Sequence, residues 1–177
     1  MKIKPVRDFW MSVIFLVAGL AAILIWTGPI VEEGGTEIFD TRTSGYDLAT
    51  ARAILESLTD RAREMYLGPQ RVADTAFPVG LLGTLAFGTI IAARRWSVKI
   101  GYALAVFPIA YFAFDMLENA GVATMIRMGA DGITEMLVDR VSGFTIWKFR
   151  FVNAALVIFL LIWTLRGIAW AIDRRST

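Results

Sequence analysis

Four polar side chains share one face of the third long apolar stretch of this sequence. Tyr111, Asp115, Glu118 and Asn119 follow one another at i, i+4, i+7 and i+8, so a helix places them on one side. Charged groups within an apolar, membrane-crossing helix are costly, and they are usually paired or functional. The spacing therefore predicts a polar stripe that either forms ion pairs inside the protein or contacts a ligand.

The second and fourth apolar stretches bring further charges to the same level. Arg71 and Asp74 are three residues apart where the second stretch begins, and Lys148, Arg150 and Asn153 lie where the fourth begins. In an up-and-down bundle the start of one helix lies beside the end of its neighbour. We therefore expect these residues and the polar stripe to form one mixed-charge polar layer.

This polar layer has three interpretations that the sequence leaves open. In the first, it is a structural network in which Arg71 or Lys148 pairs with Asp115 or Glu118 and fixes the register of the helices. In the second, Arg71 and Lys148 bind the anionic phosphate of a lipid, and the polar groups of the third stretch orient its polar end. In the third, Asp74 and the two carboxylates of the third stretch bind a hard cation such as calcium, magnesium or manganese.

Several kinds of chemistry are excluded by residue types that the chain lacks. It has no histidine and no cysteine. Disulfides, thiolate catalysis and most histidine-dependent hydrolase, zinc and haem sites are therefore excluded. No nucleophile motif is present, so we assign no catalytic residue, no metal ligand and no cofactor. The formal net charge of +2 does not indicate nucleic-acid binding, because no run of basic residues is longer than a pair.

The elements that must position these residues are long apolar helices. The 177-residue chain is 56% hydrophobic and 19% charged, with a mean hydropathy of +0.59, which is typical of a membrane protein. A helix needs about 20 apolar residues to cross the hydrocarbon core. We predict an all-α integral membrane four-helix bundle, a single domain of residues 1–177, with spans at about 10–30, 75–93, 98–119 and 150–171. The first is interpreted as a retained span rather than a signal peptide, because no small-residue cleavage site follows it.

Lysines and arginines are concentrated beside the short connections. Nine of the 18 lie in the N-terminal tail, in the turn between the second and third spans, and at the C-terminal end. The other nine are diluted among most of the acids, in or beside two longer segments, about 31–74 and 120–149. Short cytoplasmic connections carry an excess of Lys and Arg. We therefore predict a protein of the bacterial cytoplasmic (inner) membrane with both termini in the cytoplasm and both longer segments outside.

Both longer outer segments show helical periodicity. From 46 to 66 apolar residues recur at helical spacing with charges between them, which predicts one amphipathic helix or two short ones. The pair Gly68-Pro69 predicts a break before the second span. In the other segment, glycines flank a turn at 129–132, and a weaker apolar face follows at 133–141.

Small residues in the second span predict close helix packing. Gly80, Gly83 and Gly88 allow another helix to approach. Pro78 and Pro108 are interpreted as ordinary prolines of membrane helices.

Three strings of the sequence resemble elements of a group of small, uncharacterised bacterial membrane proteins with four transmembrane helices. The strings are YLGPQRVADTAFPVGLL at the start of the second span, FDMLENA at the end of the third and SGFTIWKF at the start of the fourth. That group has an aromatic-led outer helix, then R-x-x-D-x-x-[FY]-P, D-x-x-E-N and T-x-x-K elements. The resemblance covers roughly residues 44–165, departs at the Glu/Gly-rich residues 32–36, and points to the same polar layer without implying a particular activity. The matching positions are Tyr66, Arg71, Asp74, Phe77, Pro78, Asp115, Glu118, Asn119, Thr145 and Lys148.

Two classes of function are consistent with these features. The first is a non-catalytic accessory subunit or a lipid- or hydrophobic-ligand-binding protein that acts through the polar layer at the outer membrane face. The second is a small membrane enzyme that acts on a lipid headgroup with carboxylates and a hard cation. The absence of histidine and of a nucleophile motif favours the first class, the non-catalytic protein. We expect its partner to be a membrane lipid or a larger membrane-protein complex, and not a nucleic acid. The residues assigned to the polar layer are Arg71, Asp74, Tyr111, Asp115, Glu118, Asn119, Lys148 and Asn153.

Overall fold

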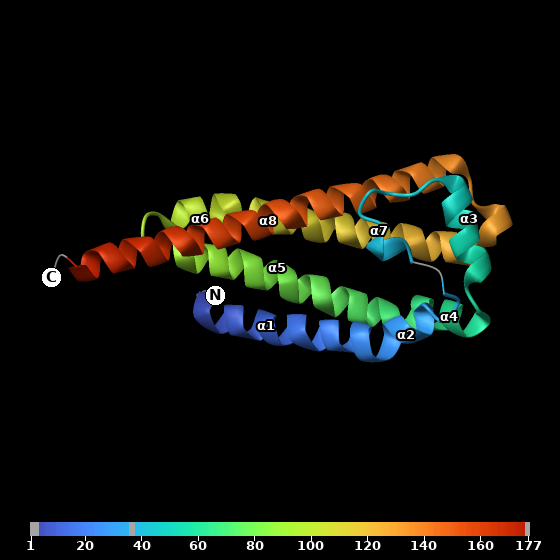
Figure 1. Cartoon of the computed structure of the whole chain (residues 1–177), viewed down its shortest axis with the longest axis horizontal. Helices are drawn as coiled ribbons and strands as arrows, with labels where there is room; N and C mark the ends of the chain where they lie inside the picture. Colours follow the sequence, from blue (N-terminus) through green and yellow to red (C-terminus); the bar gives the residue numbers. More distant parts are fainter. Residues whose placement is uncertain (1–3, 36–37, 176–177) are drawn as a thin grey trace.

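Four long helices run alternately up and down in the computed structural model, which describes residues 4–35 and 38–175 (Figure 1). Within these ranges the regular structure is entirely helical, as the sequence predicts. Each long helix has the length and apolar composition needed to cross a membrane, so the chain is a multi-pass membrane protein. The four helices extend over Pro5–Val31, Asp60–Ala93, Val98–Gly132 and Glu135–Arg175.

Three of the four spans contain more than one helical element. The fourth is a single helix of 41 residues, which is about 60 Å long and therefore projects beyond a hydrocarbon core of about 30 Å. The first span consists of α1 (Pro5–Ala22), the π-helical turn η1 (Ile23–Thr27) and α2 (Gly28–Val31). The second consists of α4 (Asp60–Met65), the π-helical turn η3 (Tyr66–Gln70) and α5 (Arg71–Ala93). The third consists of α6 (Val98–Leu104) and α7 (Val106–Gly132), and the fourth is α8 (Glu135–Arg175).

The chain between the first and second spans covers one end of the bundle. It contains the short 3₁₀ turn η2 (Phe39–Thr41) and the helix α3 (Leu48–Ser57). We call this end the α3 end, and the opposite end, which carries both termini, the terminal end (Figure 1). The α3 end has a buried apolar core made by α2, η2, α3, α4, η3, α7, α8 and the segments between them. Its members are Val31, Ile38, Phe39, Tyr46, Ala51, Ile54, Leu55, Leu58, Ala62, Tyr66, Val122, Met125, Ile126, Ile133, Val138 and Val141.

Local hydrogen bonds fix this covering segment. Asp47 precedes α3, and its carboxylate accepts a hydrogen bond from Thr50 N at 2.8 Å, which lowers the pKa of Asp47 below its ordinary value. The backbone N–H of Tyr46 donates to Ser142 Oγ on α8 at 2.8 Å. Burial raises the pKa of Tyr46, and the negative charge of Glu118 adds to the effect, so its phenol stays neutral. The hydrogen bond between Tyr46 and Ser142 thus attaches the covering segment to the fourth span, next to the polar layer.

The spans pack as two helix pairs that α5 joins. In one pair α1 lies against α5, and a Cβ added at Gly80 would come within 2.2 Å of Leu16 N. A Cβ at Gly83 would be 2.0 Å from Ser12 Oγ, so the close helix approach predicted for these glycines is present and is intramolecular. In the other pair α7 lies against α8, with stacked rings such as Phe114 and Phe151, whose centroids are 5.5 Å apart.

Two local expectations need correction. The chain does not break at Gly68-Pro69, because the π-helical turn η3 absorbs the proline and carries the helix on into α5. The apolar face predicted at 133–141 lies mostly in the first turns of α8, which begins at Glu135, rather than in a separate outer helix, and residues 133 and 134 are not helical. The turn predicted at 129–132 is confirmed as a kink at Gly129, whose φ of +72° favours glycine.

Candidate functional site

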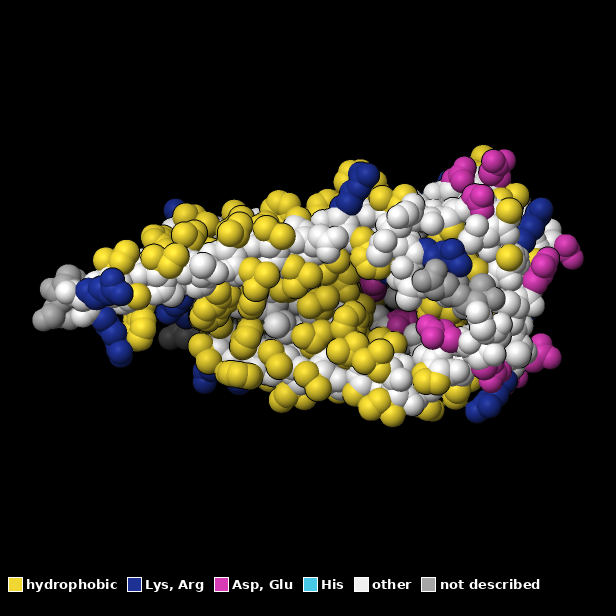
Figure 2. Space-filling model, viewed as in Figure 1, with side chains coloured by type: hydrophobic (Ala, Val, Ile, Leu, Met, Phe, Trp, Pro, Cys, Tyr) yellow, Lys and Arg dark blue, Asp and Glu magenta, His cyan; other side chains and the backbone are white. Residues whose placement is uncertain are grey.

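A cavity of about 350 Å³ lies at the α3 end, at the level of the polar layer. Residues of all four spans and of η2 form its walls. Figure 2 shows a hollow between the α1 and α8 sides of the molecule, with acidic side chains at the end nearer the α3 end. The volume is within the range of about 300–1,000 Å³ that is usual for small-molecule sites.

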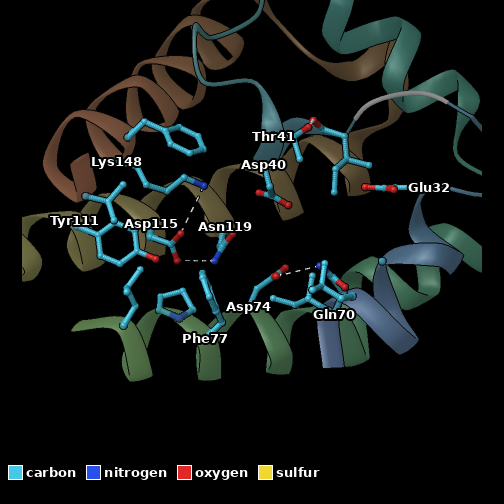
Figure 3. Close-up of a pocket in the computed structure, with 18 residues that line it drawn as sticks. Glu32, Asp40, Thr41, Gln70, Asp74, Phe77, Tyr111, Asp115, Asn119 and Lys148 are labelled. Carbon is cyan, nitrogen blue, oxygen red and sulfur yellow. Dashed lines mark hydrogen bonds and ion pairs between the residues drawn. The ribbon is translucent and has the colours of Figure 1, made fainter. Parts of the chain in front are cut away.

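The cavity wall has a polar part and an apolar part. In Figure 3, Asp40, Asp74, Asp115 and Asn119 surround a common space, and Lys148 reaches it from α8. Towards the middle of the bundle the wall becomes apolar. The polar lining residues are Glu32, Asp40, Thr41, Gln70, Asp74, Tyr111, Asp115, Asn119 and Lys148, and the larger apolar ones are Ile23, Leu24, Ile38, Phe77, Pro78, Leu81, Phe149 and Val152.

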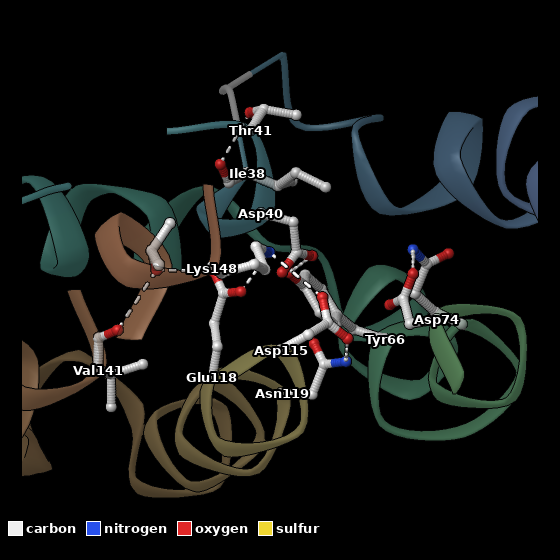
Figure 4. Close-up of polar contacts among 12 residues, drawn as sticks. Ile38, Asp40, Thr41, Tyr66, Asp74, Asp115, Glu118, Asn119, Val141 and Lys148 are labelled. Carbon is white, nitrogen blue, oxygen red and sulfur yellow. Dashed lines mark hydrogen bonds and ion pairs between the residues drawn. The ribbon is translucent and has the colours of Figure 1, made fainter. Parts of the chain in front are cut away.

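Lys148 is the centre of a buried ion-pair network (Figure 4). Its Nζ contacts Glu118 Oε2 and lies 3.6 Å from Asp115 Oδ1, and all three side chains are at least nine-tenths buried. The hydroxyl of Thr145 donates to Glu118 Oε1 at 2.6 Å. The first interpretation of the polar layer, an ion pair between Lys148 and the carboxylates of the third span, is therefore present. It accounts for Glu118, which lies behind the cavity wall.

Three of the four described carboxylates that line the cavity each accept one hydrogen bond from a neutral side chain. Asn119 Nδ2 donates to Asp115 Oδ2 at 3.2 Å, which uses the i, i+4 spacing on α7. Gln70 Nε2 donates to Asp74 Oδ1 at 3.0 Å across the junction of η3 and α5. Asp40, on η2, accepts from the Tyr66 hydroxyl, with an oxygen–oxygen distance of 2.5 Å. A carboxylate has about four lone-pair positions, so these groups keep free acceptor capacity.

Besides Glu118, two of the predicted residues, Arg71 and Asn153, lie outside the cavity. Arg71 is half-buried on another side of α5, beside Phe15 and Val72, and it forms no ion pair among the described residues. Three residues along a helix turn through about 300°, so Arg71 and Asp74 point about 60° apart. Asn153 is exposed, because five residues separate it from Lys148 and rotate it by about 140°. The predicted residues that line the cavity are Asp74, Tyr111, Asp115, Asn119 and Lys148.

Gln70 and Asp40 line the cavity but were not predicted. Gln70 and Asp74 are spaced at i and i+4, a signal that the sequence contains. Asp40 gives no local signal, since it lies in the η2 segment, which has no helical periodicity. Tyr66 and Thr145, which hold Asp40 and Glu118, appear among the positions of the family resemblance but not in the assigned site.

The charges of the wall bear on the other two interpretations. Of the described lining residues Lys148 alone is basic, whereas Glu32, Asp40, Asp74 and Asp115 are acidic. A phosphate would therefore meet several carboxylates and only one base, which is already paired. Among the described residues, no three carboxylates lie close enough together to hold a metal ion, which needs oxygen ligands at about 2.0–2.6 Å.

Comparisons with protein-family models, with curated proteins and with solved structures find no match. The chemistry of the cavity therefore carries the functional argument.

Proposed function

We propose that this protein is a non-catalytic binder of one amphiphilic, lipid-like molecule at the α3 end of the bundle. The observation that carries the proposal is a single cavity with an acidic, hydrogen-bonding part and an apolar part. A molecule with a polar head and an apolar tail matches both parts at once. Its head occupies the space between Asp40, Asp74 and Asp115, and its tail lies against residues such as Leu81 and Val152.

The cavity rim suits a ligand that comes from the membrane. Leu24 lines the cavity and is 64% exposed, although it lies in an apolar span where exposure means contact with lipid. Glu32 and Thr41, at the other part of the rim, are exposed at the α3 end, where the chain becomes polar. A lipid can therefore enter sideways with its head at the level of the interface.

A purely structural role does not account for all the acids. Lys148, Glu118 and Thr145 satisfy one another and fix the positions of α7 and α8. Asp40 and Asp74 form no ion pair within the part of the chain that the structure describes. The one base of the described wall, Lys148, is already paired with Glu118 and Asp115, so the charges of Asp40 and Asp74 are costly unless a ligand or protons compensate them.

The orientation in the membrane is part of the proposal. The described basic residues at the terminal end include Arg94, Arg95 and Lys99 in the short turn and Arg174 and Arg175 near the C-terminus. By the positive-inside rule this end faces the cytoplasm of a bacterial inner membrane. The cavity then opens at the outer leaflet.

A steric pair of variants tests the proposal. Leu24 and Ile25 are neighbours in η1 and both are exposed, at 64% and 80%, but only Leu24 lines the cavity. Leu24→Trp should extend into the cavity rim, whereas Ile25→Trp should extend into lipid. Protein purified from membranes in a mild uncharged detergent is analysed by native mass spectrometry for bound lipid.

We expect a bound lipid in the parent and in Ile25→Trp, and a several-fold lower occupancy in Leu24→Trp. Equal occupancy in the two variants, or no bound lipid in the parent, contradicts the proposal. Chemical conversion of the bound lipid during incubation would favour the alternative, a small membrane enzyme.

A further inference from the structure

We infer that the head of the bound amphiphile carries a primary ammonium group. The inference rests on the proposed function and specifies its ligand. The arrangement that carries it is a cavity in which three carboxylates with spare acceptor capacity, those of Asp40, Asp74 and Asp115, surround one space between α5, α7 and η2 (Figure 3).

Charge is the first argument. If all the lining acids are ionised, the described part of the wall has an excess of three negative charges, since four carboxylates face Lys148 alone. Lys148 itself is committed to Glu118 and Asp115. A ligand that brings a positive charge compensates this excess, whereas an anionic head increases it.

An unpartnered buried group is the second argument. Gln70 is 1% exposed and lines the cavity, and its Nε2 donates to Asp74 Oδ1. That bond fixes the orientation of the amide, because the carboxylate can accept but not donate in its ionised form. Gln70 Oε1 is buried and has no donor among the described residues. A missing donor beside carboxylates points to a ligand with N–H groups rather than to a further acceptor.

The cavity wall distinguishes an organic ammonium group from a metal ion and from a quaternary amine. The lining carboxylates surround the cavity without converging as metal ligands. Aromatic rings of Phe77, Tyr111 and Phe149 complete the wall, and aromatic faces attract organic cations. The ring of Phe149 already lies 5.2 Å from Lys148 Nζ. A trimethylammonium group has no N–H, so it cannot satisfy Gln70 Oε1.

The test compares headgroups on matched tails. The intact chain is placed in nanodiscs of phosphatidylcholine that contain equal minor fractions of phosphatidylethanolamine and phosphatidylglycerol with the same acyl chains. It is then released into an uncharged detergent, and the bound lipids are counted by native mass spectrometry. A second arm replaces both minor lipids by octadecylamine. The variants are Asp74→Asn and Asp40→Asn at the wall, with Asp131→Asn as a control, because Asp131 is exposed and does not line the cavity.

We expect octadecylamine to be retained, because it brings an ammonium group without a phosphate. All three phospholipids carry a phosphate, so among them we expect phosphatidylethanolamine to be preferred, because it alone adds a primary ammonium group. A hydrogen bond between charged groups is worth roughly tenfold or more in affinity. Each wall variant should therefore lower the occupancy by about that factor, while Asp131→Asn should not. Retention of octadecylamine but not of phosphatidylethanolamine supports the ammonium group and assigns it to a free long-chain amine.

Other results overturn the inference. If phosphatidylglycerol or phosphatidylcholine is retained equally well and the wall variants have no effect, the head is not recognised as an ammonium group, although the proposed function stands. If no lipid or amine is retained, and Leu24→Trp also equals Ile25→Trp, the proposed function fails as well. Two wall variants are used because one of them could misfold, which size-exclusion chromatography would show as aggregation. The lipid occupancy of the other variant then tests the inference.

Discussion

Replacing Lys148 by methionine tests the ion-pair network most directly. The change keeps an unbranched side chain that is one atom shorter and removes the charged Nζ, which leaves Glu118 and Asp115 buried without a base. The separation of 3.6 Å between Lys148 Nζ and Asp115 Oδ1 corresponds to a gross attraction of about 5 kcal/mol at an effective dielectric constant of about 20. Removal of one partner of a buried ion pair costs about 3–5 kcal/mol. We expect Lys148→Met to lose a free energy of unfolding in that range.

The assay is thermal unfolding in a mild detergent, followed by size-exclusion chromatography of the heated samples. For a protein of this length about 1 kcal/mol corresponds to about 2–4 °C in Tm. Lys148→Met should therefore unfold about 6–20 °C below the parent. Arg71→Met is the matched control, because Arg71 forms no ion pair among the described residues. The control should change Tm by no more than a few degrees.

A second substitution separates lost charge from lost packing. Glu118→Gln in the Lys148→Met background removes one uncompensated charge, and the new amide oxygen can still accept from Thr145 Oγ. The double variant should be more stable than Lys148→Met alone. Equal Tm values for Lys148→Met and Arg71→Met, or fully additive losses in the double variant, would refute the assignment of Lys148 as the central base.

Two further predictions concern packing and topology. Gly80→Ala should lower Tm, because its Cβ would meet Leu16 N at 2.2 Å. Gly143→Ala adds a Cβ with no atom within 4 Å, so it should leave the free energy of unfolding unchanged or raise it by roughly 1 kcal/mol through better helix propensity. The reverse order of Tm in thermal unfolding would contradict the α1–α5 contact. A cysteine introduced at Asp131 should react with an impermeant thiol reagent in intact spheroplasts and one at Ser97 should not, which is a clean comparison since the chain has no cysteine of its own; labelling at Ser97 alone would invert the proposed orientation.

The spans and the polar stripe of α7 could be predicted because both depend on local patterns. Hydropathy over about 20 residues identifies a membrane helix without reference to its neighbours. The spacing of Tyr111, Asp115, Glu118 and Asn119 determines that they share a helical face, whatever that face contacts. Asp115, Glu118 and Tyr111 are indeed buried together on the inner side of α7.

The composition of the cavity depended on the tertiary structure. The positions of Arg71 and Lys148 in the sequence place them at the same depth in the membrane. Which of the two bases reaches the carboxylates depends on the rotation of each helix about its axis. Packing against neighbouring helices sets that rotation. Lys148 faces inward with Thr145, while Arg71 lies beside Phe15 on the surface of α5.

Asp40 shows the same limit for a residue outside the helices. Its segment has no period to analyse, and it reaches the cavity only because the chain after the first span folds back and the Tyr66 hydroxyl holds its carboxylate. The amino-acid sequence by itself therefore determined the four spans and the existence of a charged layer, since these are properties of single helices. Which residues face the cavity, and the resulting excess of acids, were decided by contacts between segments far apart in the chain, which no local pattern specifies.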